Sequence, residues 1–287
     1  GMKVDISGNT KLAGILGYPV SHSLSPRMHN AAYQAMELDI CYVPLPVEQK
    51  NLKDAIRGLK VMEFIGANVT IPHKVEAALM MDNLAESAAR TGAVNTIVNS
   101  DGTFVGHNTD GEGFIRSLEE TVSLDYELAP AVVIGAGGAA RSIAVALAEV
   151  GIKQLSIVNR SIDRAAELQD LLRKSYPSVS TTVYGLNEEL GEAIEASKLI
   201  INTTPLGMDG NLKSSIVPVD NLTKDHVVCD IVYTVSGETP IVAGAREKRA
   251  TTLGGQGMLL HQGALAIRLW TGIDPPLDVM RQAIESK

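Results

Sequence analysis

The feature that most constrains the fold is a glycine turn that closes an apolar run in the middle of the chain. The run Ala131-Val132-Val133-Ile134 leads directly into Gly135-Ala136-Gly137-Gly138-Ala139-Ala140, and residues 141–151 follow with helical spacing. The pattern G-x-G-x-x-A between a strand and a helix is a tolerated variant of the dinucleotide-binding fingerprint. Its glycines allow a tight turn and a close approach of the backbone to a pyrophosphate, which would bind the N–H groups at the helix N-terminus. A purely structural glycine turn is the alternative.

The end of the next apolar run distinguishes between the two nicotinamide dinucleotides. An NAD-binding unit places Asp or Glu there, about 20 residues further on, to bind the ribose hydroxyls. Here residues 154–160 lead into Asn159-Arg160-Ser161, with Arg164 four residues after Arg160. Two guanidinium groups and a hydroxyl suit a 2′-phosphate, because the planar fork of Arg binds phosphate oxygens bidentately. The sequence therefore predicts NADP, and a solvated pair of arginines is the alternative.

Strand and helix patterns alternate around this turn from about residue 111 to residue 253. Such alternation is typical of parallel βαβ units that build a doubly wound sheet. Strands are predicted at 131–138, 154–160, 198–205 and 226–233, and helices at 141–151 and 164–175. We therefore predict a Rossmann-type α/β domain that binds NADP over 111–253.

A second, discontinuous α/β domain is predicted from 1–110 together with 254–287, and we expect it to bind the substrate. Its strands are predicted at 12–17, 41–47 and 64–71, and its helices at 26–38 and 52–62. The prolines in 41–47 confine that strand to an edge or a strand end. The last segment is too short to fold alone, but its apolar side chains need burial, so we expect it to pack on the first part of the chain.

Composition excludes several classes of partner. The chain has 287 residues and a net charge of −8, so it lacks the basic footprint of a nucleic-acid-binding protein. Neither a transmembrane run of about 18 apolar residues nor a signal peptide can be recognised. Cys41 and Cys229 have no disulfide or zinc spacing, so we expect buried thiols and a reducing cytoplasm. The six histidines show no ligand spacing, and no metal is predicted.

Polar clusters in the first part of the chain carry the candidate chemistry. Ser23 and Ser25 are two apart, which in an extended segment points both hydroxyls to one side. Ser25, directly before Pro26, is equally suited to a helix N-cap. A strand with Asn68 and Thr70 on one face delivers Lys74 just past its end.

An aspartate follows these clusters in a polar loop, Gly106-His107-Asn108-Thr109-Asp110-Gly111, with Asn95 shortly before it. Reduction of a carbonyl by NADPH needs a proton donor as well as a hydride donor. A lysine beside an aspartate can donate that proton, because the carboxylate orients the ammonium. We therefore predict Lys74 and Asp110 as catalytic residues, with a supporting structural role for Asp110 as the alternative.

These clusters, in this order, resemble the shikimate dehydrogenase family. The resemblance runs from about Leu12 to Trp270 and rests on GYPVSHSLSPRMHN (17–30), NVTIPHK (68–74), GAVNT (92–96), GHNTDG (106–111), GAGGAAR (135–141), NRSIDR (159–164), NTTPLGM (202–208), DIVY (230–233) and GGQGMLLHQG (254–263). It implies the NADPH-dependent, reversible reduction of 3-dehydroshikimate to shikimate, in the biosynthesis of aromatic amino acids. The partner it implies is this small molecule, and whether the protein is a monomer or a homodimer stays open.

The resemblance also assigns roles to individual residues. Lys74 resembles the family's catalytic lysine and Asp110 its partner. The implied substrate shell is Ser23, Ser25, Thr70, Asn95, Asp110, Tyr233 and Gln262. The implied NADP site is Gly135, Ala136, Gly137, Gly138, Ala139, Asn159, Arg160, Ser161, Arg164, Thr203, Gly255 and Met258.

The chain departs from the family pattern at two places. Ser161 stands where the family often has Thr, which keeps the hydroxyl, and Thr234-Val235 stands where Asn-Pro is common. Relatives that also oxidise quinate often have Thr in place of the second serine, so Ser25 favours shikimate. A dual quinate/shikimate dehydrogenase is the main alternative. A non-catalytic NADP-binding sensor is disfavoured, because a sensor does not need Lys74 and Asp110.

Overall fold

The computed structural model describes residues 4–185, 189–205, 217–233 and 238–286. Its contacts divide the chain into unit 1, residues 1–113 with 259–287, and unit 2, residues 114–258. The boundaries expected from the sequence were 110/111 and 253/254. In the structure they lie at 113/114 and 258/259, inside the helices α5 (Asp110–Thr121) and α10 (Gln256–Thr271). A sequence pattern that locates whole helices and strands cannot place a boundary within one helix.

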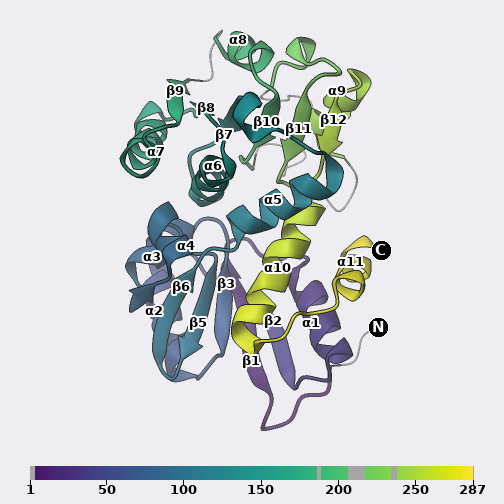
Figure 1. The fold of residues 1–287 in the computed structure, drawn as a ribbon. Helices are drawn as coiled ribbons and strands as arrows, with labels where there is room; N and C mark the ends of the chain where they lie inside the picture. The colour runs from purple at the N-terminus through teal and green to yellow at the C-terminus, as the bar shows by residue number, and fades with distance from the viewer. Residues whose placement is uncertain (1–3, 186–188, 206–216, 234–237, 287) are drawn as a thin grey trace. The chain divides into compact units, whose positions relative to one another are not determined.

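Unit 2 is built on a six-stranded parallel sheet of order β12-β11-β10-β7-β8-β9 (Figure 1). Its strands are β7 (Ala131–Ile134), β8 (Gln154–Val158), β9 (Ser180–Tyr184), β10 (Leu199–Asn202), β11 (Val227–Asp230) and β12 (Thr251–Leu253). Its helices are α6 (Gly138–Val150), α7 (Ile162–Ser175), α8 (Leu190–Glu195) and α9 (Pro240–Glu247), with the 3-10 turns η2 (Tyr126–Leu128) and η3 (Val219–Asn221). The strand order reverses beside β7, so the predicted Rossmann-type doubly wound sheet is confirmed.

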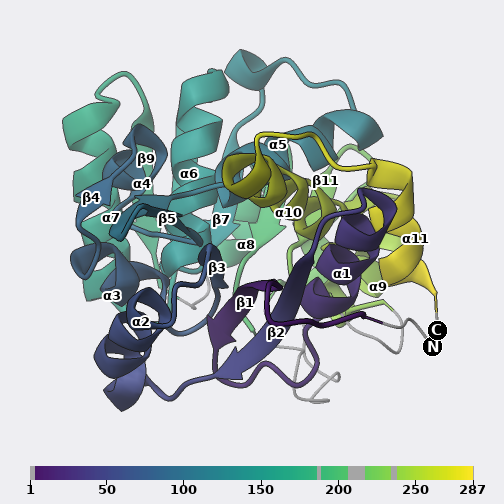
Figure 2. The ribbon, with the colours of Figure 1, turned by 90° about the horizontal axis from the view of Figure 1, so that it is seen from below.

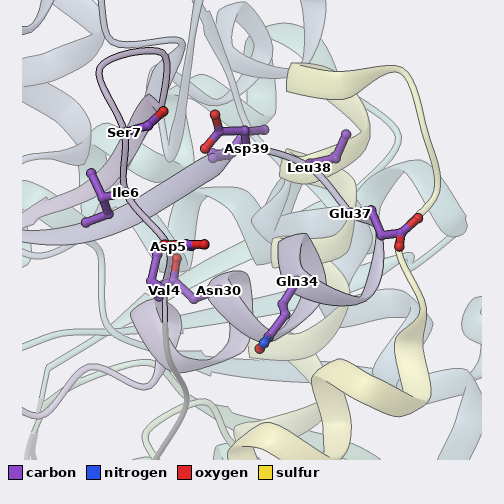
Figure 3. Close-up of a pocket in the computed structure, with 10 residues that line it drawn as sticks. Val4, Asp5, Ile6, Ser7, Asn30, Gln34, Glu37, Leu38 and Asp39 are labelled. Carbon is purple, nitrogen blue, oxygen red and sulfur yellow. The ribbon is translucent and has the colours of Figure 1, made fainter.

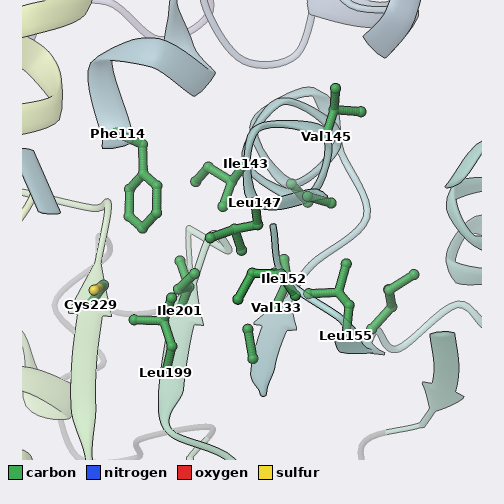
Figure 4. Packing of buried hydrophobic residues seen from close by; sticks show 14 of the residues in the cluster. Phe114, Val133, Ile143, Val145, Leu147, Ile152, Leu155, Leu199, Ile201 and Cys229 are labelled. Carbon is green, nitrogen blue, oxygen red and sulfur yellow. The ribbon is translucent and has the colours of Figure 1, made fainter. Parts of the chain in front are cut away.

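Alternate residues of the strands in unit 2 are buried on opposite faces of the sheet. Val133 belongs to the cluster under α6 and α7, whereas Val132 and Ile134 belong to the cluster under α8 and α9. Figure 4 shows Ile143 and Leu147 of α6 packed over the first of these faces. Because each fully buried aliphatic side chain contributes about 1.5–3 kcal/mol, both helical layers are fixed to the sheet.

Unit 1 contains a mixed sheet of order β2-β1-β3-β5-β6-β4. Its strands are β1 (Lys11–Gly17), β2 (Ile40–Pro46), β3 (Gly66–Val69), β4 (Asn83–Leu84), β5 (Thr96–Ser100) and β6 (Thr103–His107). The first three are parallel to one another, whereas β5 pairs antiparallel with both β3 and β6. The proline-containing strand β2 lies at the edge of the sheet, as predicted.

Helices cover both faces of the sheet in unit 1. On one face lie α2 (Leu52–Val61), which follows the 3-10 turn η1 (Gln49–Asn51), α3 (Lys74–Leu79) and α4 (Glu86–Thr91). On the other face lie α1 (Ser25–Ala35), the part of α10 after residue 258, and α11 (Leu277–Glu285). Figure 2 shows α1 and α11 side by side, although more than 240 residues separate them.

Cys41 and Cys229 are both buried free thiols, as predicted, and burial raises the pKa of each. None of the helices in the described part of the chain combines the length and the apolar character needed to cross a membrane.

We predict that Gly66→Ala destabilises unit 1 by roughly 1–3 kcal/mol, the usual cost of overpacking a close-packed interior. A Cβ at this position would overlap Ile97 O and the indole of Trp270, and would break the hydrogen bond of 2.9 Å that Trp270 Nε1 donates to Ile97 O. Urea unfolding followed by the fluorescence of Trp270, the single tryptophan, measures the effect. Gly8→Ala is the control, because nothing lies within 4 Å of its Cβ position. Equal stabilities of the two variants would contradict this packing.

Candidate active site

The structure brings the two predicted catalytic residues into direct contact. Lys74 begins α3, Asp110 begins α5, and their Nζ and Oδ2 atoms lie 2.6 Å apart with side-chain exposures of 13% and 5%. A cation at a helix N-terminus is disfavoured by the helix dipole, whereas an anion there is favoured. The start of α5 is therefore a favourable place for the carboxylate that pairs with Lys74.

Each carboxylate oxygen of Asp110 has a partner. Its Oδ1 accepts a hydrogen bond of 3.1 Å from Asn95 Nδ2, and its backbone N–H donates to Asn108 Oδ1 at 3.1 Å. Such partners matter because a largely buried ion pair is stable only where its other hydrogen-bonding groups are also satisfied. The site therefore holds a charged pair in a fixed geometry.

Asn95 joins the pair to α10. Its Nδ2 donates to Thr109 Oγ1 at 2.8 Å and more weakly to Gln262 Oε1 at 3.4 Å, while its Oδ1 accepts from Thr109 N at 2.8 Å. Thr109 Oγ1 in turn donates to the backbone oxygen of Gln262 at 3.0 Å. Four predicted site residues, Lys74, Asn95, Asp110 and Gln262, thus form one polar cluster.

The two serines are arranged differently from the extended segment expected. Ser23 N donates to Val20 O at 3.0 Å and closes a turn, and Ser23 Oγ accepts from Ser25 N at 3.2 Å. The N-cap alternative for Ser25 is also wrong, because Ser25 is already helical and Leu24 is the cap residue. Within the described residues the Ser25 hydroxyl makes no hydrogen bond, which leaves it available to a ligand.

Thr70 and Tyr233 each follow a strand, in different units. Thr70 follows β3, is half-buried, and donates its N–H to Leu16 O at 2.8 Å. Tyr233 belongs to unit 2, where it follows β11 and is half-buried. The predicted departure at Thr234-Val235 falls outside the described residues.

The glycine turn of unit 2 has the form that a pyrophosphate needs. Gly135 has φ of 118°, which favours glycine, and a Cβ there would overlap Thr203 Oγ1. Nothing lies within 4 Å of the Cβ position of the exposed Gly137, so the backbone is open to an approaching group. The first turn of α6 starts at Gly138, earlier than predicted, and its small Ala140 is fully buried against the sheet. Residues 135–140 therefore fit a dinucleotide.

The residues predicted to bind the 2′-phosphate follow β8. Arg160, Ser161 and Arg164 are exposed, and in the part of the chain that the structure describes neither guanidinium forms an ion pair. Ser161 is the N-cap of α7, since its Oγ accepts from Arg164 N at 3.4 Å. Asn159 Nδ2 donates to Ser161 O at 2.9 Å and holds this turn.

Three other predicted cofactor residues are buried in unit 2. Thr203 Oγ1 donates to Ile134 O at 2.7 Å, beside the glycine turn. A Cβ at Gly255 would overlap Ile231 O, so this position tolerates only glycine. Met258 packs in the apolar cluster under α6. Leu206-Gly207-Met208, the end of the predicted NTTPLGM block, lie outside the described residues.

The DIVY motif begins with a structural carboxylate. Asp230 Oδ1 accepts from Asn202 Nδ2 at 3.2 Å and from Val232 N at 3.0 Å, and so joins the ends of β10 and β11. Burial raises the pKa of Asp230 to about 6, and these hydrogen bonds oppose the rise.

A separate hollow lies at the start of β2. Its volume is about 470 Å³. Figure 3 shows that its lining residues include residues of α1 and residues 4–7. None of the predicted site residues lines it. Among the described residues, no group of three His, Cys, Asp or Glu side chains could hold a metal ion.

Sequence reasoning gave no individual role to Asn108 and Thr109, which position Asp110 and Asn95. Asn108 Nδ2 donates to Ala93 O at 3.0 Å, so its amide also holds the segment before Asn95. Their signal was the run of consecutive polar residues before α5. Such a run is buried only where each side chain has a partner.

Three family descriptions match successive parts of the chain. The shikimate dehydrogenase substrate binding domain matches residues 15–97, shikimate / quinate 5-dehydrogenase matches 117–207, and the shikimate 5′-dehydrogenase C-terminal domain matches 255–285.

Individual proteins match over nearly the full length. The NADP⁺-dependent shikimate dehydrogenase of Desulforamulus reducens is 42% identical, over 98% of this chain and 97% of that protein. A shikimate dehydrogenase solved in complex with NADP⁺ has a TM-score of 0.90 at 38% identity, covering 99% of this chain and 98% of the other. The enzyme of Thermus thermophilus, solved with NADP(H) and shikimate, has a TM-score of 0.85 at 31% identity, covering 96% and 99%.

Proposed function

Because the chain belongs to the shikimate dehydrogenase family, we propose that it catalyses the reversible, NADP-dependent oxidation of shikimate to 3-dehydroshikimate. The observation that carries the proposal is the largely buried contact between Lys74 and Asp110. It lies in unit 1, and Lys74 falls in the segment that matches the substrate-binding description. Carbonyl reduction needs a positioned proton donor, and this pair supplies one.

Lys74 carries the proton in the proposed mechanism. When bound, the reduced nicotinamide supplies the hydride. In the direction of reduction, the ammonium of Lys74 donates a proton to the ketone oxygen as the carbon accepts the hydride. In the direction of oxidation, the hydroxyl proton of shikimate moves to the Lys74 amine as the same carbon gives up its hydride. Asp110 keeps Nζ in place and balances the charge of Lys74 whenever that side chain is an ammonium.

The other polar residues of unit 1 orient the substrate. We assign the carboxylate of shikimate to the hydroxyls of Ser23 and Ser25. Its hydroxyl groups are assigned to Asn95, Asp110 and Gln262, which already form one cluster. Thr70 and Tyr233 complete the proposed set. Within it, Asn95 and Gln262 fix the position of the ring relative to Lys74, which lowers the entropy lost in the reaction.

Residues of unit 2 hold the cofactor. The open backbone at Gly137 and the N-terminus of α6 suit the pyrophosphate, and Ala136, Gly138 and Ala139 continue this turn. Arg160 and Arg164 are exposed cations beside the N-terminus of α7, where a 2′-phosphate would meet both charge and backbone N–H groups. Gly255 and Met258 are assigned to the nicotinamide end. The two free thiols agree with a reducing, cytoplasmic setting.

The first experiment follows the NADPH absorbance band after the protein is mixed with shikimate and NADP⁺. We expect the band to rise with this pair, and much less with quinate or NAD⁺ as replacements. Comparable rates with quinate would instead make the protein a dual-substrate dehydrogenase. Binding of NADP⁺ without turnover on either acid would indicate a sensor and contradict the proposal.

We predict that Lys74→Ala lowers kcat by roughly 10²–10⁴, the usual contribution of a positioned acid–base group. Steady-state kinetics with shikimate and NADP⁺ measure it. Lys60→Ala is the control, because Lys60 also pairs with an aspartate at 2.6 Å, but in an exposed contact with Asp82. A Lys74 variant with the kcat of the Lys60 variant would remove Lys74 from the mechanism.

We predict that Arg160→Ala raises the KM for NADP⁺ by roughly tenfold or more and leaves that for NAD⁺ almost unchanged, because only NADP⁺ carries the 2′-phosphate. Arg173→Ala, an exposed position in the last turn of α7, serves as the control. Equal losses for both dinucleotides would refute the assignment of Arg160.

A further inference from the structure

A chain of side-chain hydrogen bonds reaches the polar cluster from the opposite edge of the sheet in unit 1. Tyr42 OH donates to Asn68 Oδ1 at 2.8 Å, and Asn68 Nδ2 donates to Thr96 Oγ1 at 3.1 Å. Thr96 Oγ1 donates to Asn95 Oδ1 at 3.1 Å, and Asn95 Nδ2 then donates to Asp110 Oδ1 at 3.1 Å. The chain thus links the edge strand β2 to the ion pair.

Two backbone groups fix the direction of this chain. Thr109 N–H can only donate, so the atom of Asn95 that faces it at 2.8 Å must be the amide oxygen, and Nδ2 faces Asp110. The backbone oxygen of Asn95 can only accept, so the atom of Asn68 that faces it at 3.2 Å must be Nδ2. Both amide orientations therefore follow from chemistry.

The hydroxyl protons follow from the amide orientations. Asn68 presents its oxygen to Tyr42, so the phenol must donate. Thr96 Oγ1 accepts from Asn68, and its own proton is directed to Asn95 Oδ1. Every bond in the chain consequently points toward Asp110, and aligned hydrogen bonds in a medium of low dielectric polarise one another. The positive end of the array therefore meets Asn95 Oδ1, and Asn95 Nδ2 directs a hydrogen to the carboxylate.

Water cannot replace any member of the chain. Tyr42 is 1% exposed, Asn68 4% and Thr96 0%. A buried polar network is costly unless every group is satisfied. Apolar side chains could stabilise the sheet without a network of hydrogen bonds. Stability alone therefore does not explain why these positions are polar.

The first donor of the chain is rigidly held. The ring of Tyr42 stacks on His29 with centroids 4.0 Å apart and an interplanar angle of 15°. Burial lowers the pKa of His29 to about 3, so the imidazole is neutral and adds no charge. The backbone of Tyr42 is fixed as well, because Asn30 donates to its oxygen at 2.9 Å and accepts from its N–H at 2.8 Å.

We propose that Tyr42, Asn68 and Thr96 are positioning residues for the reaction, which hold the Asn95 amide and, through it, the contact of Asp110 with Lys74. The inference rests on the proposed function, because the effect on turnover requires Lys74 and Asp110 to act in catalysis. None of the three positioning residues needs to touch the substrate.

Tyr42→Phe and Tyr33→Phe form a matched pair that tests the proposal. Both tyrosines are 1% exposed and lie beside His29, but Tyr33 OH contacts His29 Nδ1 at 3.1 Å and has no place in the chain. Tyr42→Phe is expected to lower kcat by roughly three- to tenfold, the effect of one lost hydrogen bond, with a smaller change in KM for shikimate. Tyr33→Phe is expected to keep the wild-type kcat. The proposal would be overturned if Tyr42→Phe and Tyr33→Phe had equal kcat values and lost thermal stability to a similar extent.

Substitutions of Thr96 test the next step. Thr96→Val removes the hydroxyl at nearly constant volume and is expected to lower kcat by roughly tenfold or more. Thr96→Ser keeps the hydroxyl and is expected to retain most of the wild-type kcat. Because Tyr42 and Thr96 act through one chain, the double variant Tyr42→Phe/Thr96→Val is expected to lie within about twofold of Thr96→Val alone. Losses that multiply in the double variant, or no rescue by serine, would overturn the proposal.

The side-chain amide signal of Asn95 separates this inference from the proposed function. In protein labelled with ¹⁵N-asparagine, Tyr42→Phe is expected to shift that signal and Tyr33→Phe to leave it in place. If the wild-type protein failed to oxidise shikimate, a selective shift would still support the hydrogen-bond chain, and the proposed function alone would fail. An unshifted Asn95 signal in Tyr42→Phe would overturn the chain itself.

Discussion

A carboxylate that is almost fully withdrawn from water must be surrounded by donors, and in this protein that requirement falls on Asp110. Its two oxygens are taken by Lys74 and Asn95, and its backbone N–H by Asn108. Its place at the start of α5 adds the favourable end of a helix dipole. Loss of Lys74 would leave the buried carboxylate without a counter-charge, so the arrangement tolerates little rearrangement.

Asn95, which binds Asp110, needs hydrogen-bond partners of its own. Because Asn95 Nδ2 donates to the carboxylate and to Thr109 Oγ1, the acceptor Oδ1 faces the other way, where Thr109 N and Thr96 Oγ1 donate to it. Asn68 satisfies Thr96 in turn, and Tyr42 satisfies Asn68. Strands and helices from across unit 1 therefore contribute to the geometry of one ion pair, with the edge strand among them.

Unit 2 differs from unit 1, because the pyrophosphate contacts that we propose there are made by backbone N–H groups. The predicted cradle at 135–140 depends on the absence of side chains, with open space at Gly137 and a close neighbour, Thr203, at Gly135. The sheet beneath it is apolar on both faces, which permits close helix packing at Ala140. The hydrogen-bonded polar cluster of unit 1 suits the role of proton donor that we propose for it. The exposed backbone of the glycine turn suits the role of cofactor binding that we propose for unit 2.

Long apolar runs and the glycine turn allowed the doubly wound sheet to be predicted, but other elements escaped. The hairpin of β5 and β6 was missed, although Ser100 pairs with Thr103 across Asp101-Gly102, which both have positive φ. An Asp-Gly pair between short strands is itself a hairpin signal. The extended arrangement expected for Ser23 and Ser25 was wrong, because local hydrogen bonds there close a turn that spacing alone does not reveal.

The sequence by itself determined the class of each unit, the glycine turn and the residue types at the site, since these depend on local periodicity and on motifs a few residues long. It named Lys74 and Asp110 as a pair. Only the tertiary structure decided that Gln262 meets Asn95 across 167 residues, and that Tyr42 and Thr96 belong to the same chain of hydrogen bonds. The reason is physical: the partner of a buried polar group is set by strand register and helix packing, which bring together residues that no local pattern connects.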